Sequence, residues 1–170
     1  RSPHAHANIV RIDTAGARRA PGVLTVLTGE DAAADGLGDI PCIIPVTNLD
    51  GTPRADTPRP VLAAKRVRHV GDPVALVVAE TLAQARDAAE LVEIEYAPLP
   101  AVVDTRGATE AGAPRAWDHI ENNLCFDVGG GKSKAAVDAA FSGAAHVPRL
   151  ELINNRVIAN PIEPRAALAD

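Results

Sequence analysis

Methionine is absent from the 170-residue sequence, and aromatic residues make up only 2% of it. A hydrophobic core must therefore be built from valine, isoleucine, leucine and alanine, which dominate the 46% of hydrophobic residues. No apolar run approaches the roughly 18 residues of a membrane-spanning helix, and no signal peptide opens the chain. The two cysteines, Cys42 and Cys125, lie far apart and predict separate thiols in a reducing cytoplasm rather than a disulfide.

An excess of basic charge is also missing, because acidic and basic residues are interleaved along a chain of net charge −5. The sequence has no basic patch with interleaved aromatic residues, which argues against a nucleic-acid partner. The length suits one domain together with part of another. Because the sequence opens at Arg1 and stops at Asp170 without completing a pattern, we expect an excerpt of a longer protein.

Short apolar segments separated by turns predict an α/β (α+β) fold. The clearest pattern is a strand at 74–79, expected to be buried on both faces, followed by a helix and by a strand starting at 94. Thr81 and Gln84 form a predicted capping box at the start of that helix. This order predicts a right-handed crossover. Further strands are expected at 7–13, 23–27 and 67–70, and short helices at 14–20 and 30–34. The helix that follows the strand 74–79 is expected to have an apolar face made of Leu82, Ala85, Ala88, Ala89 and Val92.

Two stretches lack any periodicity. Residues 35–60 are rich in proline and glycine and predict a long loop with a short extended piece at 42–46. Such a loop usually serves a function or an interface. Residues 105–122 are also predicted as loop, and we place a domain boundary near Asn122. Beyond it, the pattern predicts strands at 124–128 and 146–159 on either side of a helix capped by Ser133.

Two motifs could bind a metal or a phosphate. His4 and His6 would lie on the same face of a strand, but no third ligand follows at a typical spacing, so structural histidines are favoured. Gly129–Ser133 ends like a phosphate-binding loop, yet Phe126 stands where the first glycine of that motif should be. A linker is therefore favoured there.

Acid–base and nucleophilic groups are equally sparse. Asp118 and His119, with Glu121 nearby, could form an acid–base group. Ser133 and Ser142 could act as nucleophiles, but neither lies in a G-x-S-x-G motif. A charged residue beside a histidine is common in loops, so we favour structural roles for all five.

Acidic residues beside turns are expected to accept hydrogen bonds from the backbone, which is the default role for Asp13, Asp72 and Asp104. A further pair, Glu163 and Arg165, flanks a proline after the last predicted strand. Arg165 could bind a carboxylate or phosphate through two hydrogen bonds. A structural ion pair is favoured over a contact to a cofactor.

Six segments in order resemble the large, molybdenum-bearing subunit of the xanthine dehydrogenase/aldehyde oxidase family, especially the bacterial aerobic carbon monoxide dehydrogenase type. They are RSPHAHANIVRIDT, PGVLTVLTGED, VRHVGDPVALVVAETLAQARDAAELVEIEY, PLPAVVD, AVDAAFSGAAHV and NNRVIANPIEPRAALA. The resemblance covers nearly the whole chain. It implies an α/β hammerhead domain at 1–122 that lacks its first strand, and the beginning of the first molybdopterin-binding domain at 123–170.

The resemblance also implies an activity for a parent protein: water-dependent hydroxylation of a small substrate at a molybdenum–pterin centre. The implied cofactors are molybdopterin, in its cytosine dinucleotide form, with [2Fe–2S] and FAD in partner subunits or domains of an oligomeric cytoplasmic enzyme. The family's catalytic features have no match here, so no catalytic or metal-binding residue is assigned and the excerpt is expected to be inactive. Glu163 and Arg165 stay in register with the family's PMEPR-like segment, although Ile162 replaces its methionine, and are the candidates for a cofactor contact.

A second hypothesis belongs to another class of protein. The chain could be a stand-alone binding or assembly module that uses the loop 35–60 as a docking arm. The substrate of the parent stays open between carbon monoxide, a purine, an aldehyde and an N-heterocycle.

Overall fold

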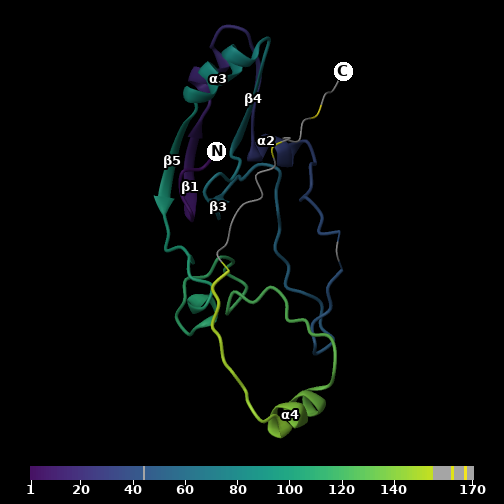
Figure 1. The fold of residues 1–170 in the computed structure, drawn as a ribbon. Helices are drawn as coiled ribbons and strands as arrows, with labels where there is room; N and C mark the ends of the chain where they lie inside the picture. Colours follow the sequence, from purple (N-terminus) through teal and green to yellow (C-terminus); the bar gives the residue numbers. More distant parts are fainter. Residues whose placement is uncertain (44, 155–161, 163–166, 168–170) are drawn as a thin grey trace. The chain divides into compact units, whose positions relative to one another are not determined.

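A computed structural model describes residues 1–43, 45–154, 162 and 167, and it divides the chain into two compact units, 1–129 and 130–170 (Figure 1). The domain boundary near Asn122 falls seven residues before the division at Gly129 and stays a prediction. No helix in the described part of the chain has the length and apolar character needed to cross a bilayer.

Strand β1 (Ala7–Asp13) is the centre of a three-stranded antiparallel sheet in the first unit. It pairs with β3 (Arg66–Val67) on one side and β5 (Glu93–Pro98) on the other, as Figure 1 shows. The main core lies on this sheet and is built from small aliphatic side chains, as the scarcity of aromatic residues requires. It contains Ala7, Ala63, Val67 and Val74, with Ile9, Ile94 and Tyr96 packed against it.

A second sheet contains only β2 (Val23–Thr28) and β4 (Ala75–Ala79), which are antiparallel. The predicted crossover within one sheet is therefore wrong. Helix α3 (Leu82–Glu90) connects β4 in this sheet to β5 in the other. The crossover rule applies to parallel strands of one sheet, whereas β4 and β5 each pair with a strand from the first 28 residues.

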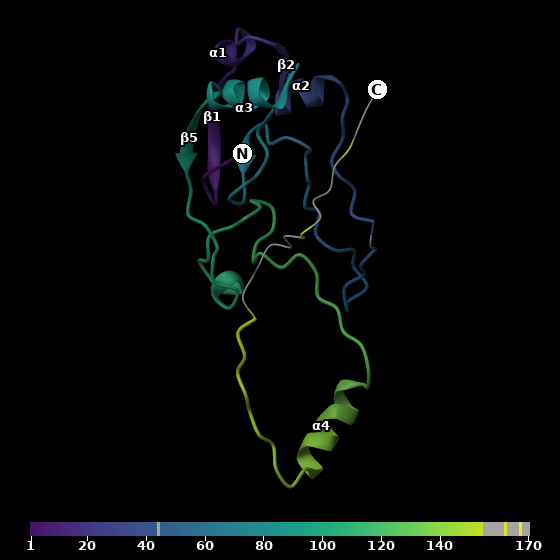
Figure 2. The same cartoon turned by 45° about the horizontal axis from the view of Figure 1, so that its top comes forward.

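The expectation that β4 is buried on both faces is also wrong. Val77 lies opposite the fully buried Val26, but Leu76 is 51% exposed and Val78 is 38% exposed. Helix α3 packs against β4 and also against helix α1 (Ala15–Arg18), and Figure 2 shows α1 and α3 side by side. Helices α1, α2 (Gly29–Ala34) and α3 make the main contacts with this two-stranded sheet, and alternate residues of β4 are exposed.

Side chains at the helix starts explain where the helices begin. Helix α2 (Gly29–Ala34) has a complete capping box, in which Thr28 and Asp31 exchange hydrogen bonds. At α3, Thr81 accepts from the Gln84 backbone, but the Gln84 side chain accepts from the Thr81 hydroxyl instead of capping the backbone. The predicted capping box of α3 is thus half formed. Its apolar face is narrower than predicted, since Ala88 is buried and Ala85 and Val92 are half-buried, while Leu82 and Ala89 are exposed.

Irregular segments complete the first unit. The loop 35–60 is confirmed as irregular over its described residues, which exclude residue 44. Within them, the structure has one isolated bridge, between Thr47 and Pro53. The extended piece predicted at 42–46 forms no strand in its described part. Residues 105–122 are loop, with one 3₁₀ turn at η1 (Gly107–Thr109). The predicted strand at 124–128 is absent. Its carbonyls instead accept single hydrogen bonds from the long loop, Ala55 N to Cys125 O at 2.7 Å and Leu49 N to Asp127 O at 2.9 Å.

The second unit contains helix α4 (Lys134–Gly143), which begins where the sequence predicts. Ser133 caps it by accepting a hydrogen bond from the backbone of Ala136. The predicted strand at 146–159 is absent over 146–154, and its remainder lies outside the described residues. A β-strand needs a neighbouring strand to form hydrogen bonds with its backbone N–H and C=O groups. No described residue pairs with this segment in that way.

Candidate functional site

The two histidines considered as metal ligands, for which structural roles are favoured, contact different partners. His4 packs edge-on against Tyr96, with ring centroids 4.9 Å apart. His6 is buried, and its Nδ1 lies 2.8 Å from the carbonyl of Pro100. Both precede β1 instead of sharing a strand face. No group of three or more His, Cys, Asp or Glu residues in the described chain could hold a metal ion.

The proposed acid–base group is also divided among structural contacts. Asp118 accepts from Arg66, while Nε2 of His119 lies 2.7 Å from the carbonyl of Asp56. Both serines are engaged locally, Ser133 as the cap of α4 and Ser142 as a donor to the Asp138 carbonyl.

The turn roles of three aspartates are confirmed. Asp13 accepts from the backbone of Ala15, and Asp72 accepts from the backbone of Arg68. Asp104 accepts from the backbone of Gly107 at 2.9 Å.

The other candidates, Glu163 and Arg165, lie outside the described residues, so their contact to a cofactor stays a prediction. Cys125 is a half-buried thiol and forms no disulfide within the described chain.

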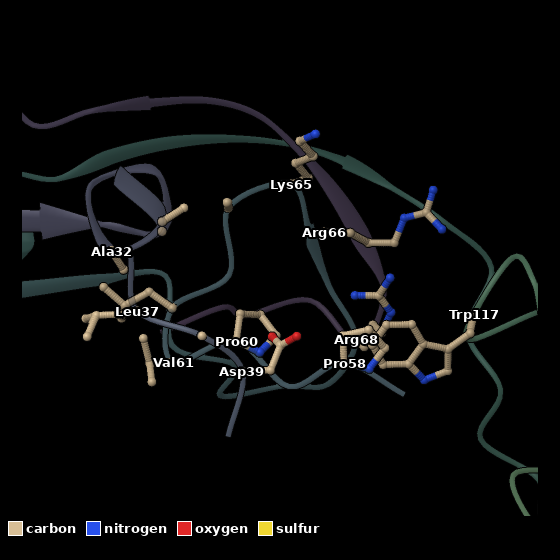
Figure 3. Close-up of a pocket in the computed structure, with 15 residues that line it drawn as sticks. Ala32, Leu37, Asp39, Pro58, Pro60, Val61, Lys65, Arg66, Arg68 and Trp117 are labelled. Carbon is tan, nitrogen blue, oxygen red and sulfur yellow. The ribbon is translucent and has the colours of Figure 1, made fainter. Parts of the chain in front are cut away.

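An open cleft in the first unit brings together residues that the sequence pattern did not connect. Its volume is about 350 Å³. Helix α2 and the loop after it form one wall, Pro58, Pro60 and Val61 form another, and the strand around β3 contributes Lys65, Arg66 and Arg68. Trp117, the only tryptophan of the chain, closes one end (Figure 3).

Arg66 is held by contacts on two sides. Its Nε donates to Asn8 Oδ1 at 2.8 Å, and its Nη1 donates to both carboxylate oxygens of Asp118 at 2.8 and 2.9 Å. Those hydrogen bonds, with the charge of the guanidinium, lower the pKa of Asp118. Asp118 therefore stays ionised and neutralises Arg66.

Arg68 is fixed without a carboxylate. Its guanidinium carbon lies 3.6 Å from the centroid of the Trp117 ring, and its Nε donates to the carbonyl of Ala116 at 3.0 Å. It forms no ion pair with any described residue. Burial and the nearby charge of Arg66 lower the pKa of Arg68. The cleft thus contains a positioned cation whose charge lacks a direct counterion.

Sequence reasoning missed this arrangement. Arg66 and Arg68 are two residues apart in an extended segment, a spacing that places both side chains on one face. That signal was available, whereas the approach of Trp117 depends on a loop about 50 residues further on. The cleft combines cations with aliphatic walls, a lining that is suited to binding.

Together, two small antiparallel sheets, short helices and an open cleft define a small domain of mixed α/β structure. The sequence of residues 1–100 matches the family described as aldehyde oxidase and xanthine dehydrogenase, a/b hammerhead domain. The chain therefore belongs to the aldehyde oxidase and xanthine dehydrogenase family, and its mixed helix-and-sheet fold is that of the hammerhead domain.

Curated relatives share the sequence over almost the whole chain. The large subunit of nicotine 6-hydroxylase from Paenarthrobacter nicotinovorans is 39% identical over 170 residues, which is 100% of this chain and 20% of the relative. The carbon monoxide dehydrogenase large chain of Afipia carboxidovorans is 36% identical, over 96% of this chain and 20% of the relative. This chain thus spans about a fifth of the length of these relatives.

Solved structures show the same fold. The Cu,Mo-CO dehydrogenase matches 86% of this chain and 18% of its own, with a TM-score of 0.65 and 35% identity. Quinoline 2-oxidoreductase from Pseudomonas putida 86 matches 72% of this chain and 15% of its own, with a TM-score of 0.61 and 42% identity.

Proposed function

We propose that this chain is a non-catalytic part of the large subunit of a molybdenum hydroxylase. Residues 1–122 would be its hammerhead domain, and residues 123–170 the beginning of its first molybdopterin-binding domain. The observation that carries the proposal is the family match over 1–100, together with relatives at 36–39% identity that extend over nearly all 170 residues. The parent would oxidise a small substrate with oxygen from water.

The described residues do not fit a molybdopterin site of their own. Two buried side-chain atoms in the described part lack hydrogen-bond partners, His6 Nε2 and Tyr96 Oη. Neither residue lines the cleft around Arg68, where Arg66 is already bound by Asp118 and Lys65 points away from Trp117, so that few polar groups converge between its aliphatic walls. A pterin cofactor needs several converging polar groups in a concave site, so the cofactor of the parent would be held by other parts of the polypeptide. The scaffold role follows from this mismatch.

The partners of the proposed parent follow from its class. Electrons would pass to [2Fe–2S] centres and FAD in other subunits or domains, and the pterin would carry a cytosine dinucleotide in a cytoplasmic enzyme. In support, a relative is named as the gamma subunit of a 6-hydroxypseudooxynicotine dehydrogenase complex, and another as a molybdenum-binding subunit of xanthine dehydrogenase.

Metal analysis of two purified proteins tests this proposal. The parent, expressed from its complete reading frame, should retain about one molybdenum per chain, whereas residues 1–170 expressed alone should retain none. A folded 170-residue chain that binds molybdenum stoichiometrically would contradict the scaffold role. A reading frame limited to these 170 residues would instead favour the stand-alone module.

A further inference from the structure

We propose that the cleft around Arg68 is a docking site for an extended polypeptide segment in which one carboxylate side chain lies between aliphatic side chains. The carboxylate would bind the guanidinium edge of Arg68, and the aliphatic side chains would cover the exposed hydrophobic residues on either side. The proposal does not depend on the identity of the parent enzyme, because it rests on the charges and walls of the cleft.

The guanidinium of Arg68 is already oriented for a carboxylate. One face stacks on Trp117 and Nε is bound by the Ala116 carbonyl, so the two terminal nitrogens form the edge that remains. In Figure 3, the guanidinium of Arg68 lies next to the Trp117 ring, whereas Lys65 points away from it. A stacked arginine presents two parallel N–H groups that match a carboxylate, and little side-chain entropy is left to lose on binding.

The charge balance of the cleft favours an anion, although the chain as a whole is acidic. Its cations are Lys65, Arg66 and Arg68, and its acidic residues are Asp39 in its own lining and Asp72, which lines the adjoining cavity and accepts a hydrogen bond from the backbone of Arg68. Asp118 neutralises Arg66 from outside the lining. No carboxylate of the described residues forms an ion pair with the guanidinium of Arg68, and partial burial strengthens the attraction of this guanidinium for an anion.

The shape of the cleft favours a peptide over a small anion. A second cavity of about 300 Å³ adjoins the first and shares Arg66, Arg68 and Trp117 with it. The first cavity has Leu37 in its lining, 60% exposed, and the second has Ile40, 47% exposed. An inorganic anion would leave both uncovered. A nucleotide base is disfavoured because Arg68 already occupies one face of Trp117.

Nuclear magnetic resonance of the ¹⁵N-labelled 170-residue chain can test the proposal, because its single tryptophan gives a single indole N–H signal at the site. Three probes would be titrated: the peptide Ac-Leu-Glu-Leu-NH₂, its uncharged counterpart Ac-Leu-Gln-Leu-NH₂, and inorganic phosphate. The glutamate peptide should shift the indole signal with a Kd on the order of 1 mM. The glutamine peptide should bind about tenfold more weakly.

Variants separate the carboxylate contact from general effects. Arg68→Gln should weaken binding of the glutamate peptide at least about tenfold, whereas Arg86→Gln, on the exposed side of α3, should change it less than about twofold. Leu37→Ser should weaken both peptides alike. Raising the salt to about 0.5 M should weaken the glutamate peptide alone.

Several outcomes would overturn the proposal. They are no shift at about 10 mM peptide, equal binding of the two peptides, or full binding to a folded Arg68→Gln variant. A phosphate shift equal to that of the glutamate peptide would reduce the cleft to a simple anion site. If Arg68→Gln does not fold, the comparison of the two peptides and the salt dependence on the unaltered chain still decide the question.

Discussion

Tyr96, the only tyrosine of the chain, carries a buried hydroxyl that lacks a hydrogen-bond partner in the described part. Burial raises its pKa, because the phenolate would lose solvation there. The nearby Ser2 opposes the rise, but its hydroxyl donates to the carbonyl of His4 at 3.1 Å. Absorbance at the phenolate wavelength should therefore titrate with a midpoint above the value of about 10 found for free tyrosine.

The sign of the effect on stability follows from the raised pKa of Tyr96. In the unfolded chain the phenol ionises first, near pH 10, so the folded state binds more protons above that pH. The stabilising contribution is present below pH 10 and is lost as the pH rises toward the pKa of the folded state. The Tyr96→Phe variant should lose this alkaline decline in the free energy of unfolding. A midpoint at or below pH 10 in the folded chain would contradict the burial of Tyr96.

Gly29 shows how one missing side chain allows two segments to approach. A Cβ atom at this position would lie 2.7 Å from both the nitrogen of Ala64 and the carbonyl oxygen of Leu62. Because those atoms belong to the backbone, they cannot rotate away, and Gly29→Ala should reduce the free energy of unfolding by about 2 kcal/mol. Urea denaturation would measure the loss. Gly38→Ala is the matched control, since a Cβ there would meet nothing within 4 Å.

At the scale of secondary-structure elements, the two faces of the β2–β4 sheet should respond differently to substitution. Val26 is fully buried, so Val26→Ala should cost about 2 kcal/mol through lost burial and the cavity left behind. Leu76 on the outer face is 51% exposed, and Leu76→Thr should change the free energy of unfolding by less than about 0.5 kcal/mol. Chemical denaturation of both variants would check this. Equal losses would show that the outer face of β4 is covered.

The elements also show which structural features the sequence could predict. Helix starts were predictable because Thr28, Thr81 and Ser133 bond to backbone groups only three residues away. Strand pairing was not, because β4 and β5 find partners about 50 to 90 residues earlier in the chain. The cleft was missed for the same physical reason, since its walls come from separate segments that only the fold brings together.

At the scale of the whole molecule, burial is distributed unevenly between the two units. Every buried residue of the described chain belongs to 1–129, the last being Ile120. Residues 130–154 are exposed throughout and include large apolar side chains, with Phe141 at 56% and Leu150 at 82% exposure. A segment that buries so little surface cannot offset the loss of chain entropy by itself. The stability of the chain should therefore reside in its first unit.

Truncation provides the corresponding prediction. The chain 1–129 should unfold in one cooperative transition, with a Tm within about 2 °C of that of the 170-residue chain, since none of the described residues after 129 is buried. A peptide of residues 130–154 should show little helix by circular dichroism, because a ten-residue helix such as α4 is marginal in water without packing. The shortened chain should also be more soluble, because exposed apolar side chains are lost with the second unit. A Tm lowered by about 10 °C or more would instead mean that residues 130–170 stabilise the sheets of the first unit. Calorimetry of both chains distinguishes these results.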